Sequence, residues 1–294
     1  MSPNKWIIKD LLEVTAQYFR DKEVDSPRLC AEILLALQLN SSRVRLYLDF
    51  DQPVSETDLA GYRALVKRRL NREPVQHITG IQEFWSMEFD IRPHVLIPRH
   101  ETEILVEQAL SLIASVEQDK TPAPSILDLG TGSGAIAVSL SKELPEATLW
   151  ASDISREALE LARLNAEKHG VKSRINFIKG DLFDAIADKT LKFDVIASNP
   201  PYIPAEEYDS LPPEVRDHEP RQSLDGHEHG TFFIEKIITQ SPDWLKPGAW
   251  LLIEMDPRQT SKALSMIEDN GAYGEKRCVK DYSQKDRVVM ARRK

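Results

Sequence analysis

The segment Ile126-Leu127-Asp128-Leu129-Gly130-Thr131-Gly132-Ser133-Gly134 decides the fold. Its apolar start predicts a buried strand over 125–130, and its glycines predict a tight turn that leads into a helix. A strand, a glycine-rich turn and a helix form the first unit of an open parallel sheet, whose ligands bind at the carboxyl ends of the strands. The glycine pattern alone is a weak signal, because a dinucleotide site usually carries its third glycine one residue later.

Strands and helices alternate after this segment. Further strands are predicted over 147–153, 175–180, 193–198 and 249–255. The extended runs 273–280 and 287–293 are separated by a short turn, and they must pair antiparallel because a parallel pair needs a long crossover. The sequence therefore predicts an α/β fold with five parallel strands and a C-terminal antiparallel hairpin, which is typical of Rossmann-like methyltransferases.

Carboxylates are expected at the ends of successive strands. Asp153 ends the second strand and suits ribose hydroxyls, while Asp181 and Leu182 follow the third and suit an adenine amino group and ring. Asp128 precedes the glycine turn and is placed to meet a methionine ammonium. Taken alone, each of these acids could equally well be an ordinary loop carboxylate as a residue that binds a ligand. Together with the turn Gly130–Gly134 they indicate one nucleoside site, and nothing is arranged for a pyrophosphate, so S-adenosylmethionine is the expected ligand.

The fourth strand runs into Asn199-Pro200-Pro201-Tyr202. The two prolines fix φ and stiffen the turn. The Asn199 side-chain oxygen and the Pro200 carbonyl can both accept hydrogen bonds from an NH₂ group, and Tyr202 can stack on a flat substrate. The four residues would hold a planar amine or amide nitrogen with its lone pair toward an electrophile. The alternative interpretation is a proline-rich turn after a core strand.

The length of 294 residues and a change of pattern near residue 76 indicate more than one domain. Helices are predicted from Trp6 to Phe19, over 26–39 and over 55–70, with Ser26 and Ser55 as N-caps. Residues 80–91 alternate and predict a hairpin, and a helix follows from Glu101 to about Val116. The expected division is a helical substrate-docking domain over 1–75, a hairpin linker over 76–98 and a methyltransferase domain over 99–294.

The composition narrows the class of protein. It is 41% hydrophobic and 29% charged, which indicates a soluble globular chain, and no run reaches the roughly 20 apolar residues of a membrane span. The N-terminus predicts no secretory signal, and Cys30 and Cys278 form no metal-type pair, so a cytoplasmic protein is expected. The net charge of −9 argues against non-specific nucleic-acid binding.

Three histidines crowd one loop among carboxylates, namely His218, His227 and His229. Metal binding is conceivable there, but the spacing matches no known metal motif. We therefore expect a polar loop that faces the substrate and no metal site.

Longer motifs carry a resemblance to a known family. Gln76–Gly80, Phe84-Trp85, Leu96–Glu103, Glu214–Pro220 and Leu224–Gly226 resemble segments of the HemK-type release factor glutamine methyltransferases, and the resemblance extends over essentially the whole chain. The chain departs from the family pattern at Met255-Asp256-Pro257, where the family often has glycine, and at Asp281–Arg287.

This resemblance implies an activity and a set of residues. It implies that Gly130–Gly134, Asp153, Leu182 and Asn199 contact S-adenosylmethionine, and that Asn199–Tyr202 hold the substrate glutamine. The implied reaction is methylation of N5 of the glutamine in the Gly-Gly-Gln loop of class 1 peptide chain release factors. We expect release factors as partners, no direct nucleic-acid partner, no membrane, and a monomer.

Two other functions share some of these features. An adenine N6 methyltransferase of nucleic acid has the same tetrapeptide, but the first 74 residues carry a net charge of +1 and the rest −10, and no basic target-recognition domain is recognisable. A non-catalytic cofactor-binding protein is the third interpretation, and the intact Asn-Pro-Pro-Tyr turn argues against it.

Overall fold

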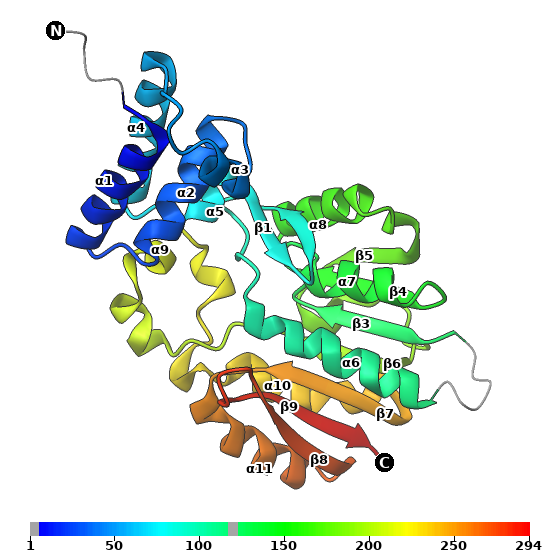
Figure 1. Cartoon of the computed structure of the whole chain (residues 1–294). Helices are drawn as coiled ribbons and strands as arrows, with labels where there is room; N and C mark the ends of the chain where they lie inside the picture. The colour runs from blue at the N-terminus through cyan, green and yellow to red at the C-terminus, as the bar shows by residue number, and fades with distance from the viewer. Residues whose placement is uncertain (1–5, 117–122) are drawn as a thin grey trace, which may run out of the picture. The chain divides into compact units, whose positions relative to one another are not determined.

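The computed structural model describes residues 6–116 and 123–294 and divides the chain into two compact units (Figure 1). The first unit contains the described residues up to Ile81 together with Pro212–His218. The second unit contains the described residues of Gln82–Leu211 and Glu219–Lys294. The segment 212–218 therefore belongs to the first unit although it lies far along the sequence from the rest of that unit.

The first unit is helical, as the sequence predicts. Its helices are α1 (Ile8–Asp21), α2 (Pro27–Gln38), α3 (Arg43–Leu48), α4 (Glu56–Leu70), α5 (Val75–Thr79) and α9 (Pro213–Arg216). Apolar residues at helical spacing, such as Leu12 and Phe19 of α1 and Leu35 of α2, are fully buried and form its core. The short helices α3 and α5 were not predicted, because a helix of five or six residues has too few turns to show a period.

One of the two predicted helix caps is wrong. Ser55 caps α4 as expected, since its hydroxyl accepts a hydrogen bond from the Asp58 N–H at 3.1 Å. Ser26 precedes α2 but has a left-handed backbone with φ 48° and makes no side-chain cap bond. An N-cap side chain reaches the first turn from an extended backbone, so the left-handed conformation of Ser26 prevents capping.

The second unit is built on a seven-stranded sheet with the order β5-β4-β3-β6-β7-β9-β8. Its strands are β3 (Ser125–Leu129), β4 (Thr148–Asp153), β5 (Ile175–Lys179), β6 (Phe193–Ser198), β7 (Leu245–Glu254), β8 (Tyr273–Lys280) and β9 (Asp286–Arg293). The first five strands in this order are parallel, and β9 pairs antiparallel with both β7 and β8. The predicted fold class is confirmed. The strand order reverses at β3, because β4 and β5 lie on one side of it and β6 and β7 on the other.

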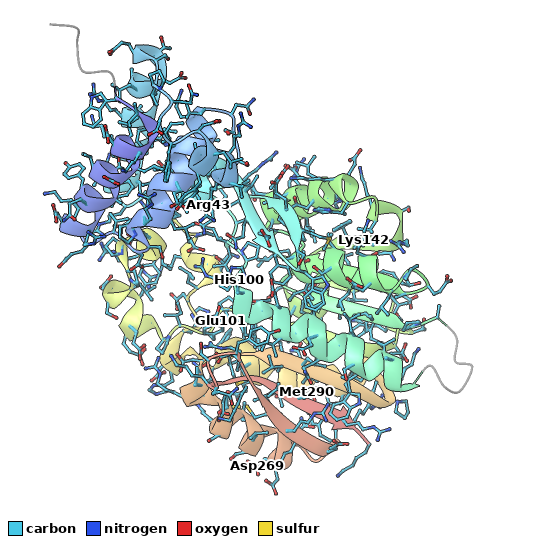
Figure 2. The ribbon with its side chains drawn as sticks, viewed as in Figure 1. Arg43, His100, Glu101, Lys142, Asp269 and Met290 are labelled. Carbon is cyan, nitrogen blue, oxygen red and sulfur yellow. The ribbon has the colours of Figure 1, made fainter. Side chains whose placement is uncertain are left out.

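Helices cover both faces of this sheet (Figure 1). They are α6 (Glu103–Val116), α7 (Ala135–Glu143), α8 (Arg156–Lys168), α10 (Phe232–Gln240) and α11 (Thr260–Asn270). Successive residues of β3 face opposite sides, so Ile126 packs in the core cluster shared with α6 and α7, and Leu127 in the cluster shared with α10 and α11. In Figure 2, Met290 of β9 lies in the core between the sheet and its helices, and Asp269 of α11 lies on the surface.

A two-stranded hairpin precedes the sheet. It consists of β1 (Ile81–Phe84) and β2 (Met87–Asp90), and its turn residues Trp85 and Ser86 both have positive φ. Phe84 and Phe89 are fully buried and meet edge to face with 6.0 Å between ring centroids. The hairpin is thereby fixed to the core of the second unit.

Short 3-10 helices complete the described secondary structure. They are η1 (His100–Thr102), η3 (Lys172–Arg174), η4 (Leu182–Ala185), η5 (Ala205–Ser210), η6 (Arg221–Ser223), η7 (Glu228–Gly230), η8 (Ser241–Asp243) and η9 (Pro257–Gln259). Across residues 6–116 and 123–294, no helix is both long enough and apolar enough to span a membrane.

Candidate functional site

One cavity of the second unit lies at the carboxyl ends of the parallel strands, and most of the residues predicted for the site line it. Those that line it are Gly130, Thr131, Gly132, Ser133, Asp153, Asp181, Leu182, Asn199, Pro200 and Pro201. They follow β3, β4, β5 and β6, which are neighbours at this edge of the sheet. The topology therefore brings together four segments that are far apart in the sequence.

Asp128 lies beneath the cavity. Its carboxylate is fully buried, where it accepts hydrogen bonds from the Thr131 hydroxyl at 2.7 Å and the Ala137 N–H at 3.2 Å. Burial raises the pKa of Asp128 to about 7, against the effect of these two donors. Asp128 is not part of the cavity lining, and its bonds hold the glycine turn and the start of α7, while its contact with a methionine ammonium stays a prediction.

Gly134 also stands outside the cavity lining. It has φ +86°, and a Cβ there would lie 3.0 Å from the Cβ of Ala162 on α8. A glycine at this position lets the start of α7 pack closely against α8.

Asp153 lines the cavity at the end of β4. One carboxylate oxygen accepts from the Gly132 N–H and the other from the Ser155 N–H, both at 2.9 Å. Burial raises the Asp153 pKa, although the N–H groups of Ser155, Gly132 and Ile154 lower it. A carboxylate offers more acceptor positions than these backbone groups fill, so Asp153 can still accept from a neighbouring hydroxyl group.

Leu182 lines the cavity with an unusual backbone. Its φ is +43°, in the left-handed region that side chains other than glycine and asparagine rarely adopt. Asp181, the residue before it, lies 3.8 Å from the Lys236 ammonium. Strained conformations of this kind persist where the surrounding structure fixes them, and they are concentrated at binding sites.

The tetrapeptide after β6 is joined to other elements by a polar network. The Asn199 Nδ2 group donates to the Thr102 hydroxyl of η1 at 3.0 Å. Thr102 in turn faces the buried Glu254 carboxylate, which accepts a hydrogen bond from the Tyr202 hydroxyl at 3.4 Å. Burial raises the Glu254 pKa to about 7 and shifts the Tyr202 pKa upward. Tyr202 does not line the cavity, and its hydroxyl points to the end of β7.

Sequence reasoning missed several residues of the cavity wall. They are His94, Val95, Leu96, Pro98, Thr102, Pro220, Gln222, Ser223 and Phe233. Two of the segments involved are fastened by Glu219, whose buried carboxylate accepts from the Ile97 N–H at 3.1 Å and pairs with Arg99. The resemblance of both segments to one family was a signal for their proximity, because it singled out 96–103 and 214–220 together. No local pattern marks Phe233.

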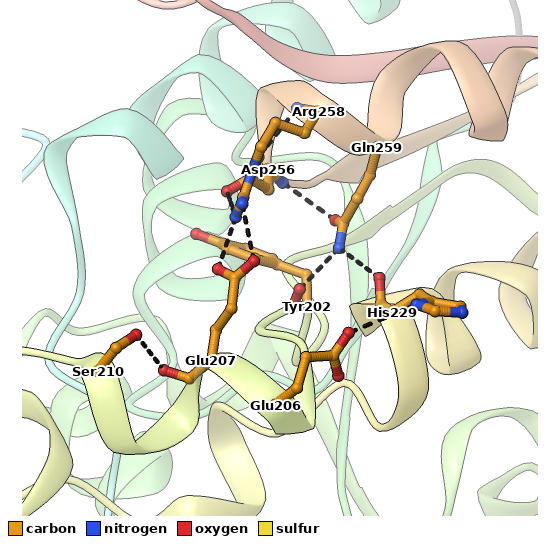
Figure 3. A network of polar contacts seen from close by, with 8 residues as sticks. All are labelled: Tyr202, Glu206, Glu207, Ser210, His229, Asp256, Arg258 and Gln259. Atoms are coloured by element: carbon orange, nitrogen blue, oxygen red, sulfur yellow. Dashed lines mark hydrogen bonds and ion pairs between the residues drawn. The ribbon is translucent and has the colours of Figure 1, made fainter.

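A second network holds the carbonyl of Tyr202 (Figure 3). The buried Gln259 amide donates to the carbonyls of Tyr202 at 2.8 Å and His229 at 3.2 Å. Its own oxygen accepts from the Asp256 N–H at 3.3 Å. Arg258 beside it forms a bidentate pair with Glu207 at 2.8 and 2.9 Å. The chain from Tyr202 to Glu207 is thus fixed to the segment after β7.

Gly230 packs directly against this part of the chain, which gives a first prediction. It has φ +69°, and a Cβ there would lie 2.2 Å from the Tyr202 carbonyl oxygen. Gly271 has a similar φ of +72° but open space around the same position. Gly271→Ala should cost about 1–2 kcal/mol of unfolding free energy for the left-handed backbone alone. Gly230→Ala should cost about 1–3 kcal/mol more, because the chain must shift to admit the methyl group.

Denaturant unfolding of both variants, followed by the fluorescence of the second unit, measures this difference. Equal destabilisation by the two substitutions would contradict the close approach of Gly230 to Tyr202.

The three histidines of the loop make different contacts. The His218 Nε2 atom lies 3.4 Å from the Asn71 carbonyl within the first unit. His227 contacts the Phe232 and Phe233 rings, and His229 lies near the carboxylates of Glu206 and Glu228. Within the described part of the chain, no group of three or more histidine, cysteine or acidic residues is arranged to hold a metal ion.

Comparisons with known proteins match both units. Residues 10–80 match the family model of the PrmC N-terminal domain, and residues 106–210 match the model of the methyltransferase small domain. The release factor glutamine methyltransferase of Geobacter sulfurreducens is 43% identical over 270 residues, which cover 92% of this chain and 91% of the relative. That of Rhodopirellula baltica is 41% identical over 285 residues, with 97% and 95% covered. That of Chlorobaculum tepidum is 38% identical over 284 residues, with 96% of each covered.

Proposed function

Because this chain belongs to the release factor glutamine methyltransferase family, we propose that it methylates N5 of the glutamine in the Gly-Gly-Gln loop of class 1 peptide chain release factors. The broader activity, transfer of a methyl group from S-adenosylmethionine to a protein glutamine, is that of the family. The observation that carries the finer proposal is the position of Asn199 and Pro200, which line the same cavity as Asp153 and Leu182.

The residues of the cavity fit S-adenosylmethionine. The Asp153 carboxylate lines the cavity where it can accept from the ribose hydroxyls, and Asp181 has a carboxylate for the adenine amino group. Apolar side chains form walls for the adenine ring and the methionine chain, including Leu182, Ile154, Val95 and Phe233. Gly130, Thr131, Gly132 and Ser133 bring backbone close to the ligand. When bound, S-adenosylmethionine supplies a methyl group already activated by the sulfonium.

The chain's own part in the reaction is placement of a weak nucleophile. An amide nitrogen is a poor nucleophile because its lone pair is delocalised into the carbonyl. The Asn199 oxygen and the Pro200 carbonyl would each accept one N–H of the substrate amide, which fixes the nitrogen and turns its lone pair along the line of transfer. These bonds strengthen as the nitrogen becomes tetrahedral and positive, so they stabilise the transition state more than the ground state. The proton is lost afterwards to water.

Pro201 and Tyr202 complete the proposed substrate-binding set. Pro201 lines the cavity beside Pro200. Tyr202 stands outside that lining, so stacking of its ring on the substrate has to occur beyond the cavity. The Tyr202 carbonyl is held by Gln259, which keeps the end of the tetrapeptide at a fixed distance from β7.

Incubation with labelled S-adenosylmethionine tests the proposed substrate. Label should transfer to a purified class 1 release factor and not to duplex DNA. A release factor with the loop glutamine replaced by alanine is the matched control, and it should remain unlabelled. Transfer to DNA, or equal labelling of the glutamine-free release factor, would contradict the proposal.

We further propose that the helical N-terminal part of the chain docks the release factor and takes no part in binding S-adenosylmethionine. The cavity residues all belong to the second unit, which supports this separation of roles. Two exposed apolar side chains of α3, Val44 at 71% and Leu48 at 73%, are available for contact with a protein partner.

A chain that begins at Pro74 tests the docking role. It should bind S-adenosylmethionine as the full chain does, and its kcat/KM for the release factor should fall by at least about 10-fold, or 1.4 kcal/mol. Calorimetric titration with the cofactor serves as the control for folding, which is needed because residues 212–218 lose their partners in this chain. Full activity toward the release factor would refute the docking role.

A further inference from the structure

The hydrogen-bond chain behind Asn199 consists of buried groups. Thr102 is 4% exposed and Glu254 is 1% exposed, and they lie on η1 and at the end of β7. Asn199 Nδ2 and Thr102 Oγ1 are 3.0 Å apart, and the Thr102 hydroxyl faces the Glu254 carboxylate, whose pKa it lowers. Of the two Glu254 oxygens, Oε2 has no hydrogen-bond partner within residues 6–116 and 123–294. Burial of a carboxylate costs folding free energy, so the position of Glu254 directly behind the tetrapeptide indicates a functional role.

The number of hydrogens available to Asn199, Thr102 and Glu254 decides which end of the Asn199 amide faces the cavity. A carboxylate only accepts, so the single hydroxyl proton of Thr102 must point to Glu254. The Thr102 oxygen then has only lone pairs to offer Asn199, so the NH₂ end of the Asn199 amide must face Thr102. The carbonyl end of the same amide is left to face the cavity. A carbonyl oxygen there can accept from the substrate NH₂, whereas the reversed amide would present two N–H groups and repel it.

We propose that Thr102 and Glu254 are positioning residues that hold the Asn199 side chain with its oxygen toward the substrate nitrogen. This inference rests on the proposed function, because only a nitrogen substrate needs an acceptor at that point. Because Glu254 accepts the Thr102 hydroxyl proton, the Thr102 oxygen accepts in turn from the NH₂ group of Asn199. Neither Thr102 nor Glu254 has to touch the reacting atoms.

The charge of Glu254 sets the direction of this hydrogen-bond chain. The groups that face it are the Thr102 and Tyr202 hydroxyls, the Arg287 guanidinium of β9 and the Glu101 carboxylate of η1. Arg287 favours the carboxylate, Glu101 and burial favour the protonated acid, and the Glu254 pKa is raised to about 7. Glu254 is therefore ionised above pH 7 and protonated below it. Protonation allows it to donate to Thr102, which removes the reason for the Asn199 amide to keep its orientation, so activity should fall as pH drops through this range.

Substitution of Thr102 tests the proposal directly. Thr102→Val keeps the shape but removes the hydroxyl, and should lower the single-turnover methylation rate by about 10- to 100-fold. Thr102→Ser keeps the hydroxyl and should restore most of the rate. Affinity for S-adenosylmethionine should stay near that of the wild type, and the melting temperature should fall by only a few degrees because the buried Glu254 loses one facing hydroxyl. Thr260→Val is the matched control, since Thr260 is equally buried and its hydroxyl bonds the Pro257 carbonyl instead.

Two further measurements separate positioning from packing. In an Asn199→Ala background, Thr102→Val should have no additional effect on the rate, because Thr102 acts through Asn199. Glu254→Gln cannot titrate, so the loss of activity near pH 7 should disappear from its pH profile. The inference would be overturned if Thr102→Val methylated at the wild-type rate, or if its effect added to that of Asn199→Ala in the double variant. It would also be overturned if the activity of Glu254→Gln still fell at low pH, or if weaker cofactor binding explained the lower rate of Thr102→Val.

The wild-type enzyme distinguishes failure of this inference from failure of the proposed function. If the wild type does not methylate the release factor, the proposed function fails before any variant is compared. If the wild type methylates it and Thr102→Val does so at the same rate, the function stands and the positioning role falls.

Discussion

Asn199→Ala is expected to slow methylation of the release factor by about 10²- to 10³-fold while leaving the fold intact. The substitution removes one hydrogen bond that is strongest in the transition state, and loss of a comparable oxyanion-hole donor costs about 3–4 kcal/mol. Asn199 follows β6 and lines the cavity, and its Nδ2 bond to Thr102 holds it there. The fold should survive because Asn199 is not one of the buried core residues. Single-turnover rates at saturating S-adenosylmethionine, read beside thermal melts, measure both effects.

Asn199→Asp is the sharper companion to the alanine variant. It keeps the size and an accepting oxygen, but its other oxygen cannot donate to Thr102, and a negative charge stands beside the sulfonium. We expect tighter cofactor binding without recovery of the rate. If Asn199 only supports the turn, both variants should lower the melting temperature and leave the rate per folded molecule near that of the wild type. A melting shift without a rate defect would end the catalytic assignment of Asn199.

Asp153→Ala is expected to produce the second large effect, on affinity for S-adenosylmethionine. Each charge-assisted hydrogen bond to a ribose hydroxyl contributes about 1.5–3 kcal/mol, so loss of one weakens binding by about 10- to 100-fold and loss of two weakens it further. The same carboxylate holds the Gly132 and Ser155 N–H groups at 2.9 Å, so its removal also loosens the glycine turn. Calorimetric titration of the cofactor measures the loss.

Two companion variants separate these contributions. Asp153→Asn keeps one accepting oxygen and should bind with intermediate affinity. Asp181→Ala removes a carboxylate that lies 3.8 Å from the Lys236 ammonium and not against the glycine turn, so the loss of affinity should be smaller. Unchanged affinity in Asp153→Ala would show that the ribose site lies elsewhere in the cavity.

The sequence was sufficient for the fold because local signals and chain order agree. The segment 126–134 carries a strand, a glycine turn and a helix start in nine residues, and the apolar strand 193–198 is followed by Asn199 and two prolines. The short link between the last two strands left only an antiparallel pairing. Ser26 shows the limit of such signals, because its backbone conformation is set by the chain around it and not by its preference as a cap.

The cavity was only partly predictable, for a physical reason. Residues that follow parallel strands meet at one edge of the sheet, so Asp153, Leu182 and Asn199 could be grouped from their strand positions. Thr102 and Phe233 come from η1 and α10, and only tertiary packing brings them to that edge. Asp128 precedes the glycine turn in sequence like a ligand-binding residue, but burial under Thr131 is a property of the folded turn.

Mass spectrometry of the methylated release factor tests the central claim most directly. The enzyme is incubated with S-adenosylmethionine and a class 1 release factor, and the digested product is sequenced by fragmentation. One added methyl group should be found on the side-chain amide of the glutamine in the Gly-Gly-Gln loop, and it should be absent when Asn199→Ala is used for the same time. A methyl group located on another residue, or a release factor that remains unmodified by the wild-type enzyme, would contradict the account.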